Sequence, residues 1–296
     1  MKKVNLLAIF AISFSLVSFV ACKSSDEFTG TDASIAATAS DEAQASSVSD
    51  QVISTADDFV NAAELNSYQQ VSTSQRVSGV STADSVIVTI DKTGLTVFPK
   101  KITVDFGTTG YTDKRGNVLK GKLYITVSNK MTIAGSSRTF SFSNFFVNDN
   151  SVKGSKTVTF IGLKGSSDSV SSVGYLSWSV VAKDTITRTD GTVVIWNSNR
   201  TRTRISNNNT PIIYWDDTYE ISGSSNGINA KGVEYTMQID AAKPLTIIGG
   251  WKYFVSGAVV ITTEKRTALL DYGNGTKDAI ATVTINGVTK EITLKK

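Results

Sequence analysis

A two-residue alternation of apolar and polar side chains, repeated over residues 85–296, most constrains how this chain can fold. In residues 233–239, Val, Tyr, Met and Ile alternate with Glu, Thr and Gln, and residues 123–127 and 281–285 follow the same pattern. This period predicts β-strands with one buried and one solvated face.

Short turn-forming sequences separate these runs. The clearest are Asp190–Gly191 and Asn286–Gly287, which lie between strand-like segments and are typical of tight hairpins. The whole chain has only three prolines, so little interrupts a hydrogen-bonded ladder. We therefore predict an all-β fold, in which residues 85–296 form one antiparallel meander, arranged as a sandwich or as a curved or closed sheet.

The aromatic stretch RTFSFSNFFVND predicts an irregularity within one strand. Phe140 and Phe142 share one parity, whereas Phe145 and Val147 share the other. A β-bulge near Ser143–Asn144 would turn both pairs toward the core.

The segment before this body is polar. Residues 22–47 are rich in Ser, Thr, Ala and Asp and have few large apolar side chains, so they predict a disordered acidic tether. Residues 48–84 predict a helix and a linker. Apolar residues recur at three- and four-residue spacing over about 49–66, after a Ser47–Asp50 pair that resembles a capping box.

Charge is divided unevenly along the chain. Residues 23–91 contain eleven acidic and two basic residues, a net charge of −9, whereas residues 92–296 contain 26 basic and 15 acidic residues, a net charge of +11. A basic body would attract anionic partners such as lipopolysaccharide phosphates or acidic glycans. Alternatively, the acidic and basic parts neutralise each other.

Three arginines could supply a polyanion-binding surface. Arg200, Arg202 and Arg204 alternate with threonines, which places them on one face of a predicted strand. The alternative is a solvated strand face whose charges deter edge aggregation. No pattern supports sequence-specific nucleic-acid recognition.

The absence of histidine excludes Ser-His-Asp and Cys-His nucleophilic catalysis. A hydrolase that uses two carboxylates stays open, because glycoside hydrolysis needs only two acids beside the bond. The candidates are Asp216, Asp217 and Glu220, with Trp215 as a platform for sugar. The alternative is a polar strand entry with a half-buried tryptophan.

Two turns resemble each other, DFGTTGYTD at residues 105–113 and DYGNGTKD at residues 271–278. They could be equivalent turns or aspartate sites for Ca²⁺, and the missing alternation of calcium loops favours turns. We predict no metal site and no cofactor.

The N-terminus has the features of an export signal. Lys2 and Lys3 precede an apolar run that ends at Ala21, so residues 1–21 predict a signal peptide. The following Cys22 is the only cysteine of the chain, and FVAC resembles the lipobox of bacterial lipoproteins, in which the thiol receives a lipid. The alternatives are an ordinary signal peptide that is cleaved beside a chance cysteine, and an anchor helix that is not cleaved.

The next residues extend this resemblance. Ser24, Ser25, Asp26 and Glu27 resemble the short acidic signal that sends Bacteroidota lipoproteins to the exterior of the outer membrane. A solvated linker is the alternative.

Residues from about 101 to 294 resemble uncharacterised Bacteroidota surface lipoproteins, in segments such as GKLYITVS, WNSNRTRTRI and DYGNGTKDAIATVTINGVTKEITL. The resemblance implies a protein anchored in the outer membrane by lipid and facing the exterior. Together with the residues above, it leads us to expect a non-enzymatic binding or structural role at the envelope. A glycan-binding or glycan-active module, and adhesion to acidic polymers through a basic surface, are the alternatives. The sequence leaves the oligomeric state open.

Overall fold

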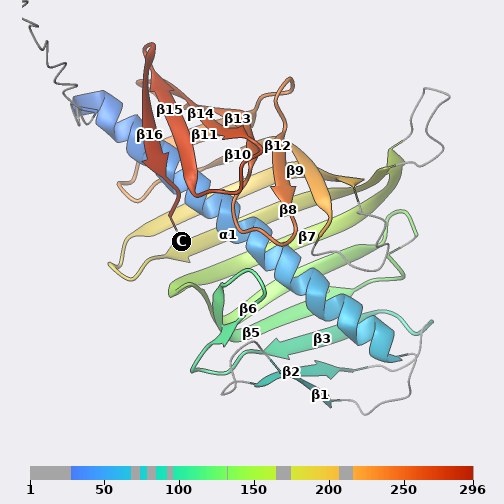
Figure 1. Cartoon of the computed structure of the whole chain (residues 1–296). Helices are drawn as coiled ribbons and strands as arrows, with labels where there is room; N and C mark the ends of the chain where they lie inside the picture. The colour runs from blue at the N-terminus through green and yellow to red at the C-terminus, as the bar shows by residue number, and fades with distance from the viewer. Residues whose placement is uncertain are drawn as a thin grey trace, which may run out of the picture.

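The computed structural model describes residues 28–67, 74–78, 85–91, 96–131, 133–164, 175–206 and 216–295. One long helix lies across a single large antiparallel sheet (Figure 1). The elements are α1 (Gly30–Ser67), β1 (Ser74–Ser78), β2 (Ser85–Ile90), β3 (Lys100–Asp105), β4 (Tyr111–Thr112), β5 (Val118–Val127), β6 (Ser137–Val147), β7 (Asn150–Lys164), β8 (Tyr175–Thr187), β9 (Val193–Ser206), β10 (Thr218–Ile228), β11 (Glu234–Ile239), β12 (Leu245–Ile248), β13 (Ser256–Thr262), β14 (Thr267–Asn274), β15 (Ile280–Ile285) and β16 (Val288–Thr293).

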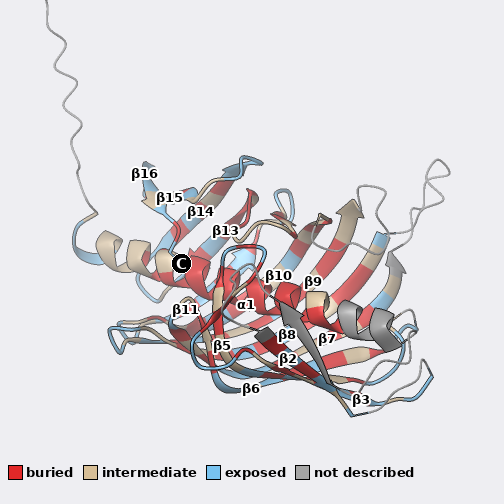
Figure 2. Ribbon diagram, turned by 60° about the horizontal axis from the view of Figure 1, so that its bottom comes forward, coloured by how far each residue is buried: buried red, intermediate tan, exposed pale blue. Residues whose placement is uncertain are grey.

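The predicted all-β meander is confirmed, and of the arrangements considered it is a curved sheet. Neighbouring strands follow chain order from β1 to β16, except that β12 pairs with β10 and β13 and β4 pairs with β5. The sheet curves around α1, and its C-terminal strands rise beside the first half of the helix (Figures 1 and 2). The concave face therefore receives the helix, and the convex face lies opposite.

The predicted turn chemistry is confirmed. Gly191 lies in the β8–β9 turn and adopts a φ of 81°, while Asn286 and Gly287 adopt φ values of 51° and 80° between β15 and β16. Glycine and asparagine accept this left-handed conformation more readily than other residues, which explains why these sequences form the hairpins.

The predicted bulge in β6 is also confirmed. The register of β6 with β7 shifts between Ser141 and Phe146, and Asn144 adopts a φ of 45°. Phe140 and Phe145 are both buried, although they have opposite parity. The bulge therefore turns aromatic side chains from both halves of the strand into the core.

The prediction of a disordered tether over residues 22–47 is wrong for residues 30–47. These residues form the first half of α1, which begins at Gly30 rather than near residue 49. Ser47 is not a helix cap, because it lies inside the helix and its hydroxyl donates to the Lys252 carbonyl at 2.7 Å. In the predicted linker, residues 74–78 form β1, which pairs with β2.

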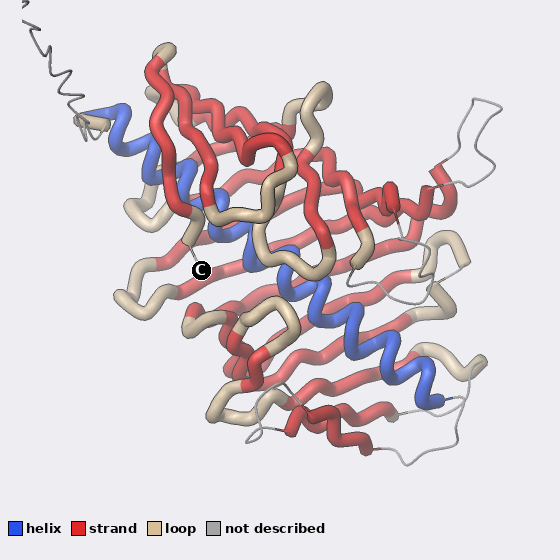
Figure 3. The backbone as a smooth tube through the Cα atoms, viewed as in Figure 1, coloured by secondary structure: helices blue, strands red, loops and turns tan. Residues whose placement is uncertain are grey.

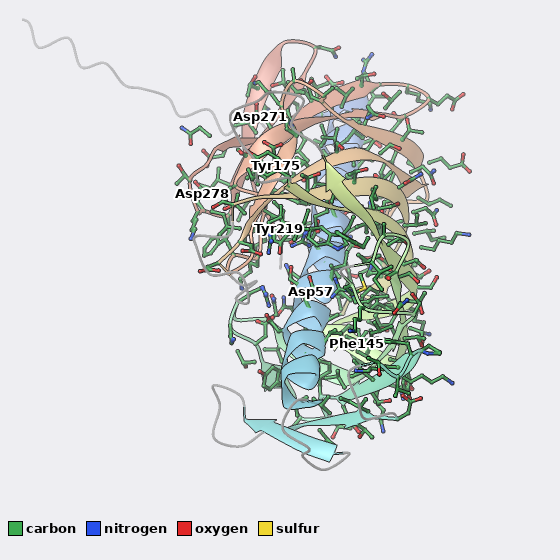
Figure 4. The ribbon with its side chains drawn as sticks, turned by 90° about the vertical axis from the view of Figure 1, so that its right-hand side faces the viewer. Asp57, Phe145, Tyr175, Tyr219, Asp271 and Asp278 are labelled. Carbon is green, nitrogen blue, oxygen red and sulfur yellow. The ribbon has the colours of Figure 1, made fainter. Side chains whose placement is uncertain are left out.

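α1 is polar yet deeply enclosed. Every residue from 41 to 56 is buried, and most of these residues carry polar side chains. A helix that is buried all round is ordinarily apolar all round. Here Val48, Val52 and Phe59 join the hydrophobic core, while polar side chains such as Glu42 find partners on the sheet. The helix runs across the strands (Figure 3), and side chains of the strands surround it (Figure 4).

Two glycines of β7 allow a test of how closely the strands pack. Gly154 and Gly162 adopt nearly the same φ, 125° and 124°, but a Cβ on Gly154 would lie 1.9 Å from the Lys183 carbonyl oxygen, whereas one on Gly162 would meet nothing within 4 Å. We expect Gly162→Ala to lower the free energy of unfolding by about 1–3 kcal/mol through backbone strain. Gly154→Ala should cost about 1–3 kcal/mol more through overpacking. Urea denaturation measures both, and equal losses would contradict the close approach.

Candidate functional site

A cluster of buried polar side chains lies between α1 and strands β9 to β11. Glu42 of α1 accepts hydrogen bonds from Trp196 Nε1 at 2.8 Å, Ser225 Oγ at 3.0 Å and Tyr235 Oη at 3.0 Å, and pairs with Arg200 Nη2 at 3.1 Å. These partners come from three strands, so one carboxylate holds the helix to much of the concave face.

Burial dominates the electrostatics of this carboxylate. Desolvation raises the pKa of Glu42 above 4.5, although Arg200 and the three neutral donors oppose the rise. Burial also raises the pKa of the Tyr235 hydroxyl, and the Glu42 carboxylate adds to that rise. Arg200 is further held by stacking over the Trp196 ring, with its Cζ atom 4.8 Å from the ring centroid.

A second cluster lies farther along the helix. Asp50 pairs with Arg202 Nη1 at 3.4 Å, and Ser49 accepts a hydrogen bond from Lys156 Nζ at 2.8 Å. Lys156 is also paired with Asp184 of β8. Burial raises the pKa of Asp50 and lowers the pKa of Lys156, because each charge has been removed from water.

Further ion pairs join the helix to the sheet at its two ends. Each unites an acidic residue of α1 with an arginine of a strand or turn: Asp32 with Arg266, Asp41 with Arg188, Asp57 with Arg138, and Asp58 with Arg115. The acidic and basic parts of the chain therefore meet in contact. Of the two predictions from the charge distribution, mutual neutralisation is the one that these contacts support.

The prediction of an exposed arginine stripe is wrong. Arg200 and Arg202 are each only 4% exposed, and both face α1. Arg204 is partly buried and lies 3.4 Å from Asp217. The two-residue period correctly placed the three guanidinium groups on one face, but that face is concave and covered by the helix.

Three of the four candidate glycan residues are described, and these three do not line one cleft. Trp215 lies outside the described residues. Asp217 is fully buried, and burial raises the pKa of its carboxyl, although the hydrogen bond that it accepts from Tyr219 Oη at 3.0 Å opposes the rise. Glu220 follows Tyr219 on the alternate, convex face of β10, and Asp216 is partly buried. The prediction that Asp217 could face a sugar as one of two carboxylates is therefore wrong, because its side chain is buried.

The two similar aspartate turns are equivalent in structure. The Gly107 amide donates to Asp105 Oδ1 at 3.0 Å, and the Gly273 amide donates to Asp271 Oδ1 at 2.8 Å. The Oδ1 atom of each aspartate therefore accepts a hydrogen bond within its own turn, which agrees with the prediction of two equivalent turns. Among the described residues, no group of three or more His, Cys, Asp or Glu side chains is placed to hold a metal ion.

Sequence reasoning missed the acidic partners on α1. Glu42, Asp50 and Asp58 recur every eight residues, which corresponds to roughly 12 Å along a helix and a little over two turns. Acids at a regular spacing along a helix, together with three arginines on one strand face, formed the available signal. The low apolar content of residues 22–47 concealed it.

A small cavity lies beside the Asp50–Arg202 pair. It has a volume of about 10 Å³ and is lined by Asp50, Ser198, Arg200 and Arg202 among others. Within the described part of the chain, Ser198 Oγ and the Nε atoms of both arginines have no hydrogen-bond partner. The space is suited to about one water molecule, which would satisfy these donors.

Comparison of the chain with protein-family models, curated proteins and solved structures found no match. In the described ranges, no helix is both long enough and apolar enough to cross a membrane.

The buried ion pairs predict a graded response to mutation. Arg200→Ala leaves the enclosed Glu42 carboxylate without its counter-charge and should lower the free energy of unfolding by about 3–5 kcal/mol. Arg266→Ala is the matched control, because Arg266 and its partner Asp32 are 42% and 31% exposed and such pairs contribute about 0–1 kcal/mol. Urea denaturation gives both values. Similar losses for the two variants would show that the inner pair is not sealed from water.

The raised pKa of Glu42 predicts a pH dependence. Between the ordinary pKa and the raised one, the folded chain keeps a proton that the unfolded chain has lost, so this group's contribution to stability falls as pH rises through the raised pKa. Glu42→Gln removes this titration. We expect the wild-type free energy of unfolding minus that of the variant to fall as pH rises above about 4.5, by about 1.4 kcal/mol per pH unit until the raised pKa is passed. A difference that is constant or grows over this range would contradict the assignment.

Proposed function

We propose that this protein is anchored to the outer membrane by lipid on Cys22, faces the cell exterior and has a non-enzymatic binding or structural role at the envelope. The observation that carries this proposal is the close approach of the fold to that cysteine. α1 begins at Gly30, only eight residues after Cys22, and lies across the concave face of the sheet.

This geometry shortens the expected tether. The chain between Cys22 and α1 is seven residues, whose fully extended length is at most about 25 Å. The N-terminal end of the helix is fixed to the body by Asp32, which pairs with Arg266 and lies 3.4 Å from Asn286 Nδ2. A lipid on Cys22 would therefore hold the body close to the membrane surface rather than on a long stalk.

The non-enzymatic role is supported by how the chain uses its charged groups. The acids of α1 and the arginines of the concave face are paired with each other, and Asp217 is sealed beneath the surface. Such groups build the fold and are not presented to a substrate. Because the concave face is filled by α1, partners are expected on the convex face, where the alternative of glycan binding finds its own support.

Lipid attachment is tested by replacing the cysteine. Cys22→Ser in the native organism should abolish incorporation of labelled palmitate and release the protein from the outer-membrane fraction, because stable anchoring takes two or more acyl chains. The control is Asp26→Asn combined with Glu27→Gln, which keeps Cys22 and should keep the label. If the acidic signal directs export, this control also becomes resistant to protease added to intact cells. Unchanged labelling of Cys22→Ser would overturn the proposal.

A further inference from the structure

A groove crosses the convex face of the sheet, on the side opposite α1. It has a volume of about 660 Å³ and lies over strands β9, β10 and β11 and the end of β13. The side is fixed by alternation: Trp196 and Tyr235 point inward to Glu42, so their neighbours Ile195, Asn197 and Glu234 point outward. The volume is within the range of about 300–1,000 Å³ of small-ligand sites.

The strand register arranges the outward side chains in two parallel rows. In the first row, Asn197 is opposite Asn226, Asn226 is opposite Thr236, and Thr236 is opposite Thr262. The two amides contact each other, with Asn197 Nδ2 3.3 Å from Asn226 Oδ1. This row therefore presents neutral groups that both donate and accept hydrogen bonds across four strands.

The second row is apolar at one end and acidic at the other. Ile195 is opposite Ile228, and Ile228 is opposite Glu234, while Glu264 lies beyond the end of β13 and also lines the groove. Ile195 is 39% exposed, so apolar surface is open to a ligand. Four strands at a spacing of about 4.8 Å give the rows a length of roughly 14 Å.

The charges of the groove differ from those of the surrounding body. Neither Glu234 nor Glu264 forms an ion pair within the described ranges, and no lysine or arginine is among the described residues that line the groove. Lys183 of β8, which is opposite Asn197, and Lys265, which follows Glu264, lie outside this lining, and Arg266 is paired with Asp32 of α1. The residues that line the groove therefore carry two carboxylates and no cation, which disfavours anionic ligands.

From these rows we infer that the groove binds a short uncharged oligosaccharide. Sugar hydroxyls both donate and accept, which matches the amide and hydroxyl row, and the glutamates would accept the stronger, charge-assisted hydrogen bonds. The isoleucines would contact the apolar C–H face of a ring. A basic peptide would pair with the two glutamates but would not use the amides and hydroxyls of the neutral row. The inference does not depend on the lipid anchor, because the groove is built from strands alone.

The experiment probes the full-length protein, purified in detergent, with immobilised tetrasaccharides of glucose, mannose and xylose. Heparin tetrasaccharide and tetralysine are the anionic and basic comparisons. We expect at least one neutral tetrasaccharide to bind with a Kd below about 1 mM, which corresponds to about −4 kcal/mol, and neither charged probe to bind as tightly.

Two variants then locate the binding. Asn226→Ala and Glu234→Gln should each weaken the bound tetrasaccharide by about tenfold, the loss expected for one hydrogen bond of about 1.4 kcal/mol. Asn199→Ala is the matched control, because Asn199 is exposed on the same face of β9 but does not line the groove, and it should bind as the parent does. The inference is overturned if no neutral sugar binds, if tetralysine or heparin binds more tightly, or if the control loses as much affinity as Asn226→Ala.

Discussion

Acidic side chains on α1 pair with arginines on the concave face, and these pairs fix the helix against the sheet. The helix has too few large apolar residues to be held by hydrophobic burial alone, and its enclosed part spans residues 41–56. Glu42 alone joins three strands, so removing its partner would leave a desolvated charge. Removing a charge from water costs free energy, and leaving a buried charge without its partner costs more. The pairs therefore hold the helix in its place against the curved sheet.

A curved sheet also needs places where its strands can bend. The bulge in β6 lies beside Gly121, where a Cβ would be 1.8 Å from the Asn144 carbonyl oxygen, so only glycine permits this approach. Gly154 serves a similar purpose between β7 and β8. These local irregularities bring the strands around the helix, while the aromatic residues Phe106 and Phe145 fill the space near its C-terminal half.

The same alternation divides the sheet into two surfaces with separate roles. Inward residues of β9 to β11 hold α1, and outward residues of the same strands form a groove with one neutral polar row and one row that is apolar at one end and acidic at the other. Because the inward set is engaged with the helix, recognition at the envelope is proposed for the outward set. Mutations of the groove can therefore be made without touching the ion pairs, since successive residues on a strand point to opposite faces.

Patterns among neighbouring residues were enough to predict the strands, the hairpins at Asp190–Gly191 and Asn286–Gly287, and the bulge in β6. They also placed the three arginines on one face. That this face is covered, and that residues 30–47 are helical, became visible in the folded chain alone, because the partners are far apart in sequence: Glu42 and Arg200 are separated by 158 residues. The composition of a segment indicates how much apolar surface it can bury. It does not show whether distant strands supply partners for the charges of a polar segment.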